Sequence, residues 1–306
     1  MKGGTSNISV VPEFMKKIQF HEYLMGLLLL QVIVRLAIKA SFNEWFFAYI
    51  AVFAVYGLII FYGTKSMHPL FNRIRLLCNI AIMFFAYSSI KYIIPVFFGS
   101  YTFDGMLSSL DKSIIGGDLS HTAQRIYSSP LTELMSTGYF SYYVAIAVTL
   151  LYYGFRSSIE TFCKFCMGLF GIFALGIIAY TIVPAVGPYV YFKGTYDRQL
   201  TGYLMTKLNN FVVISGSCKY DVFPSLHTGV GLFILLFTFF NSRKGFYVFL
   251  IPFIFLISST IYLRYHYFTD LFCGACLSIA VFITSKLIFE GMKKKLLIGK
   301  ESSLPG

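Results

Sequence analysis

Long apolar runs alternate with short polar segments along the whole chain of 306 residues. Each run approaches 20 residues, which is the length that an α-helix needs to cross the hydrocarbon core of a bilayer. The pattern predicts eight such helices, at about 21–40, 44–62, 76–98, 133–153, 162–183, 224–240, 246–263 and 267–289. We therefore expect an all-α, polytopic helical membrane protein.

Two longer polar segments, 99–132 and 184–223, interrupt the apolar pattern. The first contains a predicted helix at 104–117 that ends at two glycines. Five apolar residues share one face of this helix: Met106, Leu107, Leu110, Ile114 and Ile115. A helix with one apolar face is typical of a segment that lies on the membrane surface. The same helix could also form a lip over an active site.

The composition agrees with a membrane protein, because 57% of the residues are hydrophobic and only 12% are charged. In ordinary soluble domains about a quarter of the residues are charged. The net charge of +12 comes from short basic clusters between apolar runs, and Lys293, Lys294 and Lys295 follow the last run. Such clusters mark the cytoplasmic side of a membrane protein and meet anionic lipid, so we expect no nucleic-acid partner.

Eight crossings place both termini on one side of the membrane. The same side receives the basic loop 63–75, Arg156, and Arg243 with Lys244, whereas both longer polar segments fall on the opposite side. Because short basic loops stay in the cytoplasm, we expect cytoplasmic termini. The opposite side is then extracytoplasmic.

Two histidine motifs lie at the edges of apolar runs on the extracytoplasmic side. The stretch 223–229 reads Phe-Pro-Ser-Leu-His-Thr-Gly and contains His227, and the stretch 264–270 reads Arg-Tyr-His-Tyr-Phe-Thr-Asp and contains His266. The run between them provides about one crossing out and one back, which returns the second histidine to the side of the first. We expect the two histidines to share one phosphate.

The second motif has the spacing of a histidine that is activated by a carboxylate. Asp270 lies four residues after His266, so both occupy one face at the start of a helix. The carboxylate can hold one imidazole nitrogen protonated and leave the other as a nucleophile. Arg264 is a cation suited to binding phosphate oxygens. In the alternative interpretation, Arg264 and Asp270 pair with each other and anchor the helix end.

The first motif has the features of an anion site at a helix N-terminus. Pro224 favours a helix start, with Ser225 and His227 in the first turn. Free backbone N–H groups and the positive end of the helix dipole bind anions there, and the hydroxyls of Ser225 and Thr228 are further candidate donors. A phosphate site beside two histidines, an aspartate and an arginine indicates phosphoryl transfer.

The two motifs resemble the second and third signatures of the type 2 phosphatidic acid phosphatase superfamily, Pro-Ser-x-His and Ser…His-x-x-x-Asp. They match at 224–227 and 259–274, and the resemblance covers about residues 76–290. Leu226 and Thr260 stand where members with phosphatase activity commonly have Gly and Arg, and the first signature, Lys-x6-Arg-Pro, is not found intact. Leu226 and the His-Tyr-Phe-x-Asp ending are similar to the inositol phosphorylceramide synthase branch.

The resemblance implies a role for each residue of the pair of motifs. His266 is the nucleophile that forms a phosphohistidine, Asp270 orients it, and His227 protonates the leaving alcohol and then activates the acceptor. An unperturbed histidine titrates near pH 6.5, so this scheme predicts a bell-shaped pH profile. The phosphate-binding cations of the missing signature must come from elsewhere, and the candidates are Arg264, Lys193, Arg198 and Lys219.

The scheme needs no metal or other cofactor. The chain has 13 acidic residues, and none of them cluster in the way that two-metal phosphoryl transfer requires. We therefore expect neither a metal nor a cofactor.

The resemblance also predicts how the chain is divided. Residues 1–75 form an N-terminal tail and a two-helix membrane extension. Residues 76–290 form a six-helix catalytic core that includes the extracytoplasmic segment 104–117, and residues 291–306 form a cytoplasmic basic tail.

Three functions are compatible with these features. The first, favoured by Leu226 and Thr260, is transfer of a phosphoryl head group such as phosphoinositol from a phospholipid to a lipid alcohol such as ceramide or diacylglycerol. The second is a lipid phosphate phosphatase that uses the same site with water as acceptor. The third is a lipid transporter or scramblase, for which charged residues within the apolar runs could line a path: Lys91, Lys164 and Lys286. In each case the expected partners are membrane lipids.

Overall fold

The computed structural model describes residues 13–66 and 68–301, with side chains described up to residue 294. Residues 1–12 of the predicted N-terminal tail, and the side chain of Lys295 with residues 302–306 of the predicted C-terminal tail, lie outside this description. In the described ranges every regular element is a helix, and none is a β-strand. The all-α class is confirmed.

All eight apolar runs form helices, and the largest differences from the predicted bounds are an earlier start of the third and a later end of the eighth. The helices are α1 (Phe20–Ile38), α2 (Glu44–Lys65), α3 (Pro69–Phe98), α6 (Ser129–Arg156), α7 (Ile159–Tyr180), α10 (Leu226–Asn241), α11 (Arg243–Tyr262) and α12 (Phe268–Glu301). Seven of these segments are long and apolar enough to cross a membrane, and α10, with 16 residues, is the shorter apolar helix.

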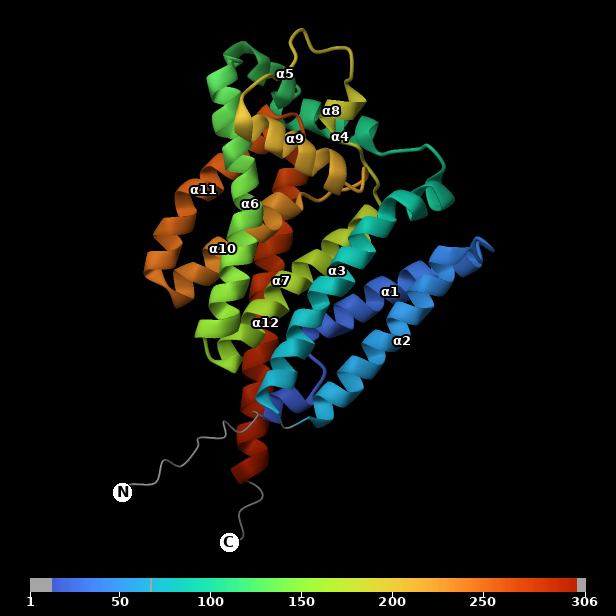
Figure 1. Ribbon diagram of the computed structural model, residues 1–306, viewed down its shortest axis with the longest axis vertical. Helices are drawn as coiled ribbons and strands as arrows, with labels where there is room; N and C mark the ends of the chain where they lie inside the picture. The colour runs from blue at the N-terminus through green and yellow to red at the C-terminus, as the bar shows by residue number, and fades with distance from the viewer. Residues whose placement is uncertain (1–12, 67, 302–306) are drawn as a thin grey trace.

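Short helices precede α1 and occupy the segments between the long helices. These are η1 (Glu13–Lys16), α4 (Asp104–Ile115), α5 (Leu119–Ala123), η2 (Gln124–Ile126), α8 (Pro188–Tyr191) and α9 (Leu204–Gly216). Figure 1 shows α4, α5, α8 and α9 gathered at one end of the bundle, and η1 at the other. The two longer polar segments therefore each contain short helices, and these helices cover the same end.

Helix α7 lies at the centre of the bundle, where α1, α3, α10 and α12 pack around it. Its apolar residues extend round the whole helix, as expected for a helix without an exposed face. Two glycines allow α10 to approach closely. A Cβ atom at Gly168 would lie 2.1 Å from the Phe233 ring, and one at Gly176 would lie 2.5 Å from the Leu226 side chain. Small residues at such contacts are common between membrane helices.

Helices α10 and α12 also meet through glycine. A Cβ atom at Gly274 of α12 would lie 2.3 Å from the carbonyl oxygen of Ser225, just before α10. The backbone N–H of Ser225 donates to the carbonyl oxygen of Asp270 over 2.9 Å. This close approach brings together the two segments that contain the histidine motifs.

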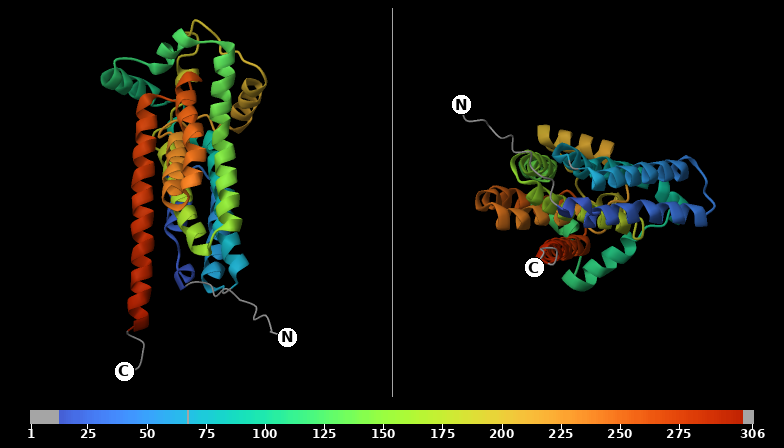
Figure 2. Two further views of the ribbon diagram at one scale, coloured as in Figure 1. Left: turned by 90° about the vertical axis from the view of Figure 1, so that its left-hand side faces the viewer. Right: turned by 90° about the horizontal axis from the view of Figure 1, so that it is seen from below.

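The opposite end of the bundle contains an ion pair in which both side chains are buried. The guanidinium of Arg75 on α3 and the carboxylate of Glu22 on α1 both have 0% exposed side chains. Arg75 Nε donates to Glu22 Oε1 over 2.7 Å, and the other guanidinium nitrogens also donate to the carbonyl oxygens of Met15 and Lys17. The pair therefore ties α1, α3 and the segment before α1 together. In both upright views, η1 and the start of α3 lie toward the lower end (Figures 1 and 2).

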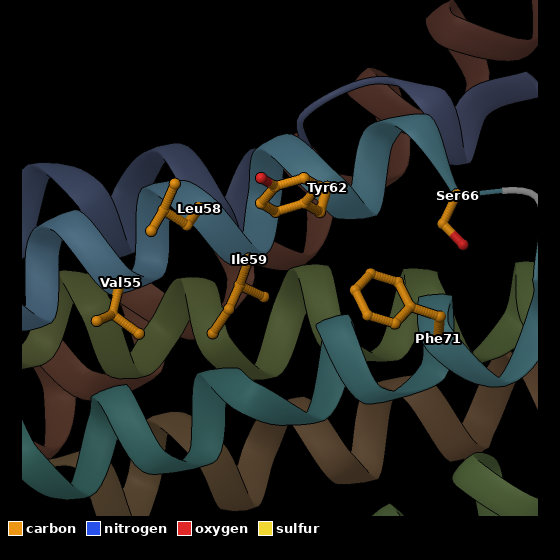
Figure 3. A pocket seen from close by; sticks show the side chains of 6 residues that line it. All are labelled: Val55, Leu58, Ile59, Tyr62, Ser66 and Phe71. Carbon is orange, nitrogen blue, oxygen red and sulfur yellow. The ribbon is translucent and has the colours of Figure 1, made fainter.

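A groove of about 490 Å³ lies between α2 and the start of α3 (Figure 3). Its walls are almost entirely apolar, and the residues that line it are Val55, Leu58, Ile59, Tyr62, Ser66 and Phe71. Most of α2 is exposed in the described structure, as expected for a lipid-facing helix. The groove contains no histidine or carboxylate, so it offers no groups for phosphoryl transfer.

Candidate active site

The first histidine motif forms the start of α10. Helix α10 begins at Leu226 with Ser225 as its N-cap, so Pro224 precedes the cap and lies two residues before the helix. The Ser225 hydroxyl accepts a hydrogen bond from the Thr228 backbone N–H over 3.3 Å, and the Thr228 hydroxyl donates to the same oxygen. Both hydroxyls are thus part of the cap of α10.

The second motif places His266 in a short connection between α11 and α12. The carbonyl oxygen of Thr260, at the end of α11, accepts hydrogen bonds from the backbone N–H groups of Tyr265 and His266. Arg264 has a φ of 67°, a left-handed conformation that turns the chain before His266. The backbone of this turn therefore fixes the position from which the His266 side chain extends.

His266 lies between a carboxylate and the second histidine. Its Nδ1 is 2.9 Å from Asp270 Oδ2, and its Nε2 is 3.1 Å from His227 Nδ1 and 3.4 Å from Ser225 Oγ. The His266 side chain is 3% exposed and the Asp270 side chain is fully buried. The structure therefore brings together His266, His227, Asp270, Ser225 and Thr228, as the sequence predicts.

These distances define which nitrogen of His266 is available for chemistry. A carboxylate only accepts hydrogen bonds, so the proton on Nδ1 of His266 faces Asp270. In neutral His266 the lone pair is then on Nε2, the nitrogen that faces His227. The nucleophilic nitrogen of His266 and a proton-donating nitrogen of His227 can therefore act on the same bound group.

Two tyrosines of α6 hold the other histidine. The ring centroids of Tyr139 and Tyr142 lie 4.6 Å and 4.5 Å from that of His227, and Tyr265 packs on Tyr139 with centroids 4.9 Å apart. Contacts from two rings fix the plane of the imidazole. Neither tyrosine belongs to the two histidine motifs, because both lie about 90 positions before His227 in the chain.

Arg264 is buried, but its guanidinium is not paired with Asp270. It packs over the Tyr196 ring at 3.8 Å, and Nη2 donates to the carbonyl oxygen of Arg198 over 2.8 Å. Burial lowers the pKa of Arg264, although a guanidinium stays charged at neutral pH. Asp270 pairs with His266 instead, so the alternative in which Arg264 and Asp270 anchor the helix end is wrong.

The other candidate cations have exposed side chains. Lys193 and Arg198 lie between α8 and α9, and Lys219 precedes the first histidine motif. Arg198 contacts Arg264 through its backbone oxygen. Among the described residues, none of these three side chains forms a hydrogen bond with either histidine.

Helix α4 holds the start of α12 by a carboxylate. Asp111 is buried, and its two oxygens accept hydrogen bonds from the backbone N–H groups of Phe268 and Thr269 over 2.8 Å and 2.9 Å, and from the Thr269 hydroxyl over 2.6 Å. These N–H groups have no partner within α12 itself, because they belong to its first turn. Asp111 therefore fixes the turn that carries Asp270.

A second carboxylate of α4 holds the segment beside His266. Asp104 accepts hydrogen bonds from the backbone N–H groups of Val186 and Gly187 and from the Tyr267 hydroxyl over 3.0 Å. Burial, with the nearby Asp104 carboxylate, raises the pKa of Tyr267, so its phenol remains a donor. Asp104 and Asp111 are seven residues apart on one helical face, a spacing that is visible in the sequence.

The predicted helix at 104–117 exists, but its buried face is more polar than expected. Asp104, Leu107 and Asp111 face the protein, whereas Met106, Leu110 and Ile114 are exposed. The prediction that Leu107 shares one apolar face with Met106, Leu110 and Ile114 is therefore wrong. The helix ends at Gly116 in a left-handed conformation, as the glycine pair predicts. Figure 2 shows α4 against the start of α12.

The two departures from the signatures have structural explanations. Leu226 packs on Gly176 of α7, so this side chain contributes to the contact between α10 and α7. Thr260 is buried, and its hydroxyl donates to the carbonyl oxygen of Ile257 in its own helix. Neither residue indicates by itself which molecule accepts the phosphoryl group.

Within the described residues, no group of three or more His, Cys, Asp or Glu side chains could hold a metal ion. The two imidazoles and the Asp270 carboxylate lie together at one end of a bundle of apolar helices. This arrangement is typical of multi-pass membrane enzymes that transfer or remove phosphate groups.

Comparison with known proteins agrees with this class. The chain belongs to the PAP2 superfamily, whose family model matches residues 106–284. It is 26% identical over 200 residues to an inositol phosphorylceramide synthase from Candida albicans, and the match covers 59% of this chain but only 41% of that protein. No solved structure matches the chain. It is thus an integral membrane enzyme of the lipid phosphatase and phosphotransferase type.

Proposed function

We propose that the protein is a lipid phosphotransferase, which moves a phosphoryl head group such as phosphoinositol from a phospholipid to a lipid alcohol such as ceramide or diacylglycerol. The observation that carries the proposal is the position of His266 Nε2, opposite a carboxylate-bound Nδ1 and 3.1 Å from His227. The similarity to a protein named inositol phosphorylceramide synthase supports the choice of head group and acceptor.

In the first step, Nε2 of His266 attacks the phosphorus of the donor lipid. The N–P bond forms as the bond between phosphorus and the diacylglycerol oxygen breaks, and His227 gives its proton to that oxygen. The products are diacylglycerol and a phosphohistidine that carries the head group. Asp270 accepts the hydrogen bond from Nδ1 throughout, and it stabilises the positive charge on the ring.

In the second step, the acceptor alcohol takes the place of diacylglycerol. His227, now neutral, removes the hydroxyl proton, and the alcohol oxygen attacks phosphorus while the N–P bond breaks. His266 returns to its neutral form and His227 to its protonated form. No step requires a metal, and we expect turnover to continue in the presence of a chelator.

The direct contact of the two rings determines where phosphorus must enter. Nε2 of His266 and Nδ1 of His227 are at hydrogen-bond distance. A phosphoryl group that binds between them must replace this contact, with the leaving oxygen on the His227 side. The attacking and leaving atoms would then lie roughly in line, as phosphoryl transfer requires.

The non-bridging oxygens require donors near the same point. The start of α10 offers backbone N–H groups and the positive end of its dipole beside His266. The Ser225 hydroxyl is 3.4 Å from His266 Nε2, so it is the nearest side-chain donor, with Thr228 behind it. Arg264 and the exposed Lys193 and Arg198 remain candidate cations, which would have to turn toward the site.

A lipid phosphate phosphatase is the second candidate, with water in place of the alcohol. The packing of Leu226 on Gly176 explains this residue by a contact between helices, which removes one reason to choose transfer over hydrolysis. The chemistry of both steps is otherwise the same. Only the acceptor distinguishes the two functions.

We also propose the orientation and division of the chain. The connection from α11 to α12, which contains His266, lies at the end covered by α4, α5, α8 and α9. The C-terminal ends of α2 and α6, with Lys65 and Arg156, point to the other end, which supports an extracytoplasmic site and cytoplasmic termini (Figure 1). Helices α3, α6, α7, α10, α11 and α12 would form the catalytic core. Helices α1 and α2 would be an extension, although α1 packs directly on α7.

The purified protein tests the proposal when it is incubated with phospholipid labelled in its head group, with and without ceramide or diacylglycerol. We expect a new labelled lipid that depends on the added alcohol and forms equally well in EDTA. Release of a water-soluble phosphate product alone, whichever alcohol is added, would contradict transfer and support the phosphatase. Movement of intact donor between leaflets without any product would support a transporter.

A further inference from the structure

Arg35 is a charged residue near the C-terminal end of α1, in a segment that is apolar enough to cross a membrane. A charge in such a segment is costly, so it requires a partner and indicates a function. The half-buried Arg35 donates through Nη1 to the carbonyl oxygen of Thr181, at the end of α7. Its guanidinium also lies 3.9 Å from the ring centroid of Phe97, at the end of α3. Arg35 therefore joins α1 to the ends of two helices of the proposed catalytic core.

The contact with Thr181 caps helix α7. Thr181 is the C-cap residue of α7 and is buried. Carbonyl oxygens at a helix C-terminus lack partners within the helix, and a cation there also meets the negative end of the helix dipole. Gln31, one turn before Arg35 on α1, donates through Nε2 to the Thr181 hydroxyl over 3.2 Å. Two side chains of α1 thus hold the point at which the chain leaves α7.

The same guanidinium contacts the end of α3. Phe97 and Phe98 are the last two residues of α3, and their ring centroids lie 3.9 Å and 5.6 Å from the guanidinium carbon of Arg35. Contacts with aromatic faces stabilise a cation in apolar surroundings. The Phe98 ring packs edge-on against Phe103, the residue before α4. Arg35 therefore also holds the point at which the chain leaves α3 for α4.

The chain segments that follow α3 and α7 meet again at the start of α4. The backbone N–H of Phe103 donates to the carbonyl oxygen of Pro184 over 2.8 Å. Asp104, the next residue, accepts hydrogen bonds from the backbone N–H groups of Val186 and Gly187 over 3.0 Å and 2.8 Å. The two segments that Arg35 holds where they leave the bundle are thus bound to each other beyond it.

The segment that follows α7 packs on the turn that carries His266. The backbone N–H of Tyr189 donates to the carbonyl oxygen of Arg264 over 2.6 Å. Gly187 is so close to this turn that a Cβ atom at its position would lie 2.6 Å from the carbonyl oxygen of Tyr265. A shift of the segment 182–189 would therefore move the backbone on both sides of Tyr265, and with it the His266 ring.

We propose that Arg35 is a positioning residue for the phosphoryl-transfer site, which acts through Thr181 and the segment 182–189 on the turn that carries His266. The inference rests on the proposed transferase function, and it gives the two-helix extension a role in that function. A misplaced nucleophile slows the chemical step, because the reacting atoms must be held close together and in line. The effect of Arg35 should therefore appear in kcat rather than in KM.

The first test compares two replacements of Arg35 in the full-length protein, by transfer of labelled head group in vesicles. Arg35→Met removes the donor and retains an apolar stem, and we expect kcat to fall about tenfold with KM nearly unchanged. Arg35→Lys retains a cation that can donate to Thr181, so it should recover most of the lost rate. A wild-type kcat in Arg35→Met, or a loss confined to KM, would overturn the inference.

Two further variants control for charge and for folding. Lys39→Met removes an exposed cation one turn further along the chain, and its kcat should equal that of the wild type. An equal loss in Lys39→Met and Arg35→Met would show a general effect of charge and overturn the inference. Gln31→Leu leaves the charge in place and removes the other bond to Thr181, so we expect a smaller loss of kcat. If Arg35→Met does not fold, a wild-type kcat in Gln31→Leu overturns the inference instead.

Hydrogen–deuterium exchange separates this inference from the proposed function. We expect the backbone N–H groups at 186–189 and 265–266 to exchange faster in Arg35→Met than in the wild type or in Lys39→Met. Unchanged exchange at these positions would overturn the positioning role, whatever reaction the protein catalyses. If the wild type forms no labelled lipid with any alcohol, the proposed transferase fails, and the exchange rates still decide whether Arg35 positions the turn.

Discussion

The two ends of the helix bundle each contain a buried basic group beside a buried carboxylate, and the two pairs differ in how completely they are satisfied. Arg75 directs its guanidinium to both oxygens of Glu22 and to two backbone carbonyls. Asp270 has one oxygen on His266 and the other, Oδ1, without a partner in the described structure. His266 in turn directs Nε2 at a second titratable ring.

This difference indicates a structural role for the Arg75–Glu22 pair and a chemical role for the His266–Asp270 pair. A buried charge is tolerated when every donor and acceptor is fixed, and the Arg75–Glu22 pair meets this condition. A group that must exchange a proton or form a bond requires a free position, and His266 has one. Burial and charge alone, which both ends share, therefore do not identify the active site.

The largest expected effect is at the histidine end. His266→Ala removes the proposed nucleophile, and we expect turnover to fall by at least about 10³-fold, since acid–base and nucleophilic groups contribute on this scale. The thermal melting temperature should change little. Turnover within tenfold of the wild type would exclude His266 as nucleophile.

The opposite result is expected at the other end of the bundle. Glu22→Gln leaves Arg75 charged and buried without its counter-ion, which costs about 3–5 kcal/mol of folding stability. Turnover per folded molecule should stay at the wild-type level. Thermal unfolding with activity assays below the transition measures both quantities.

A matched double variant controls for the size of that effect. Replacing both partners with apolar residues, as in Glu22→Leu with Arg75→Met, removes the charge as well as the pair. Such replacements are often neutral, so stability should recover to near that of the wild type. If Glu22→Gln is fully stable, the pair at this end does not have the structural role assigned to it.

A smaller effect is expected at Asp111, which touches neither ring. Asp111→Asn weakens the bonds to the first turn of α12 and loosens the position of Asp270, so we expect kcat to fall about tenfold with KM nearly unchanged. Asp118→Asn is the control, because the Asp118 side chain caps α5 by accepting a hydrogen bond from the His121 backbone N–H. A change in KM alone would contradict a positioning role.

The smallest expected effect is the change of the turnover rate with pH. The proposed scheme needs a lone pair on Nε2 of one histidine and a proton on the other in the same enzyme molecule. Added protons block the nucleophile and lost protons block the acid, so the rate should fall on both sides of an optimum. A flat profile from pH 5 to 8 would contradict the assignment of these roles.

The sequence predicts the helices and the histidine pair because both depend on patterns within short stretches. An apolar run of about 20 residues has one stable structure in a bilayer, and the spacing of His266 and Asp270 places them on one helical face. Two crossings between the motifs then return His266 to His227. All of this follows from the length of runs and the spacing of residues.

Contacts between distant elements could not be predicted in this way. Asp111 and Glu133 look like ordinary charges of polar segments, and only the packing of α4 on α12 and of α9 on α6 shows that each caps another helix. Helix α9 itself, with 13 residues, is too short for a membrane crossing, and its buried face is polar. Leu226 contacts Gly176, which is a consequence of how α7 and α10 approach each other.

The central claim is that His266 becomes covalently phosphorylated, and trapping this state tests it most directly. The wild type is mixed with head-group-labelled phospholipid in the absence of acceptor, quenched within one turnover and mapped by mass spectrometry. We predict a base-stable, acid-labile label on His266 that disappears when ceramide is added and is absent from His266→Ala. Turnover without any protein-bound label, or a label that persists in His266→Ala, would contradict the account.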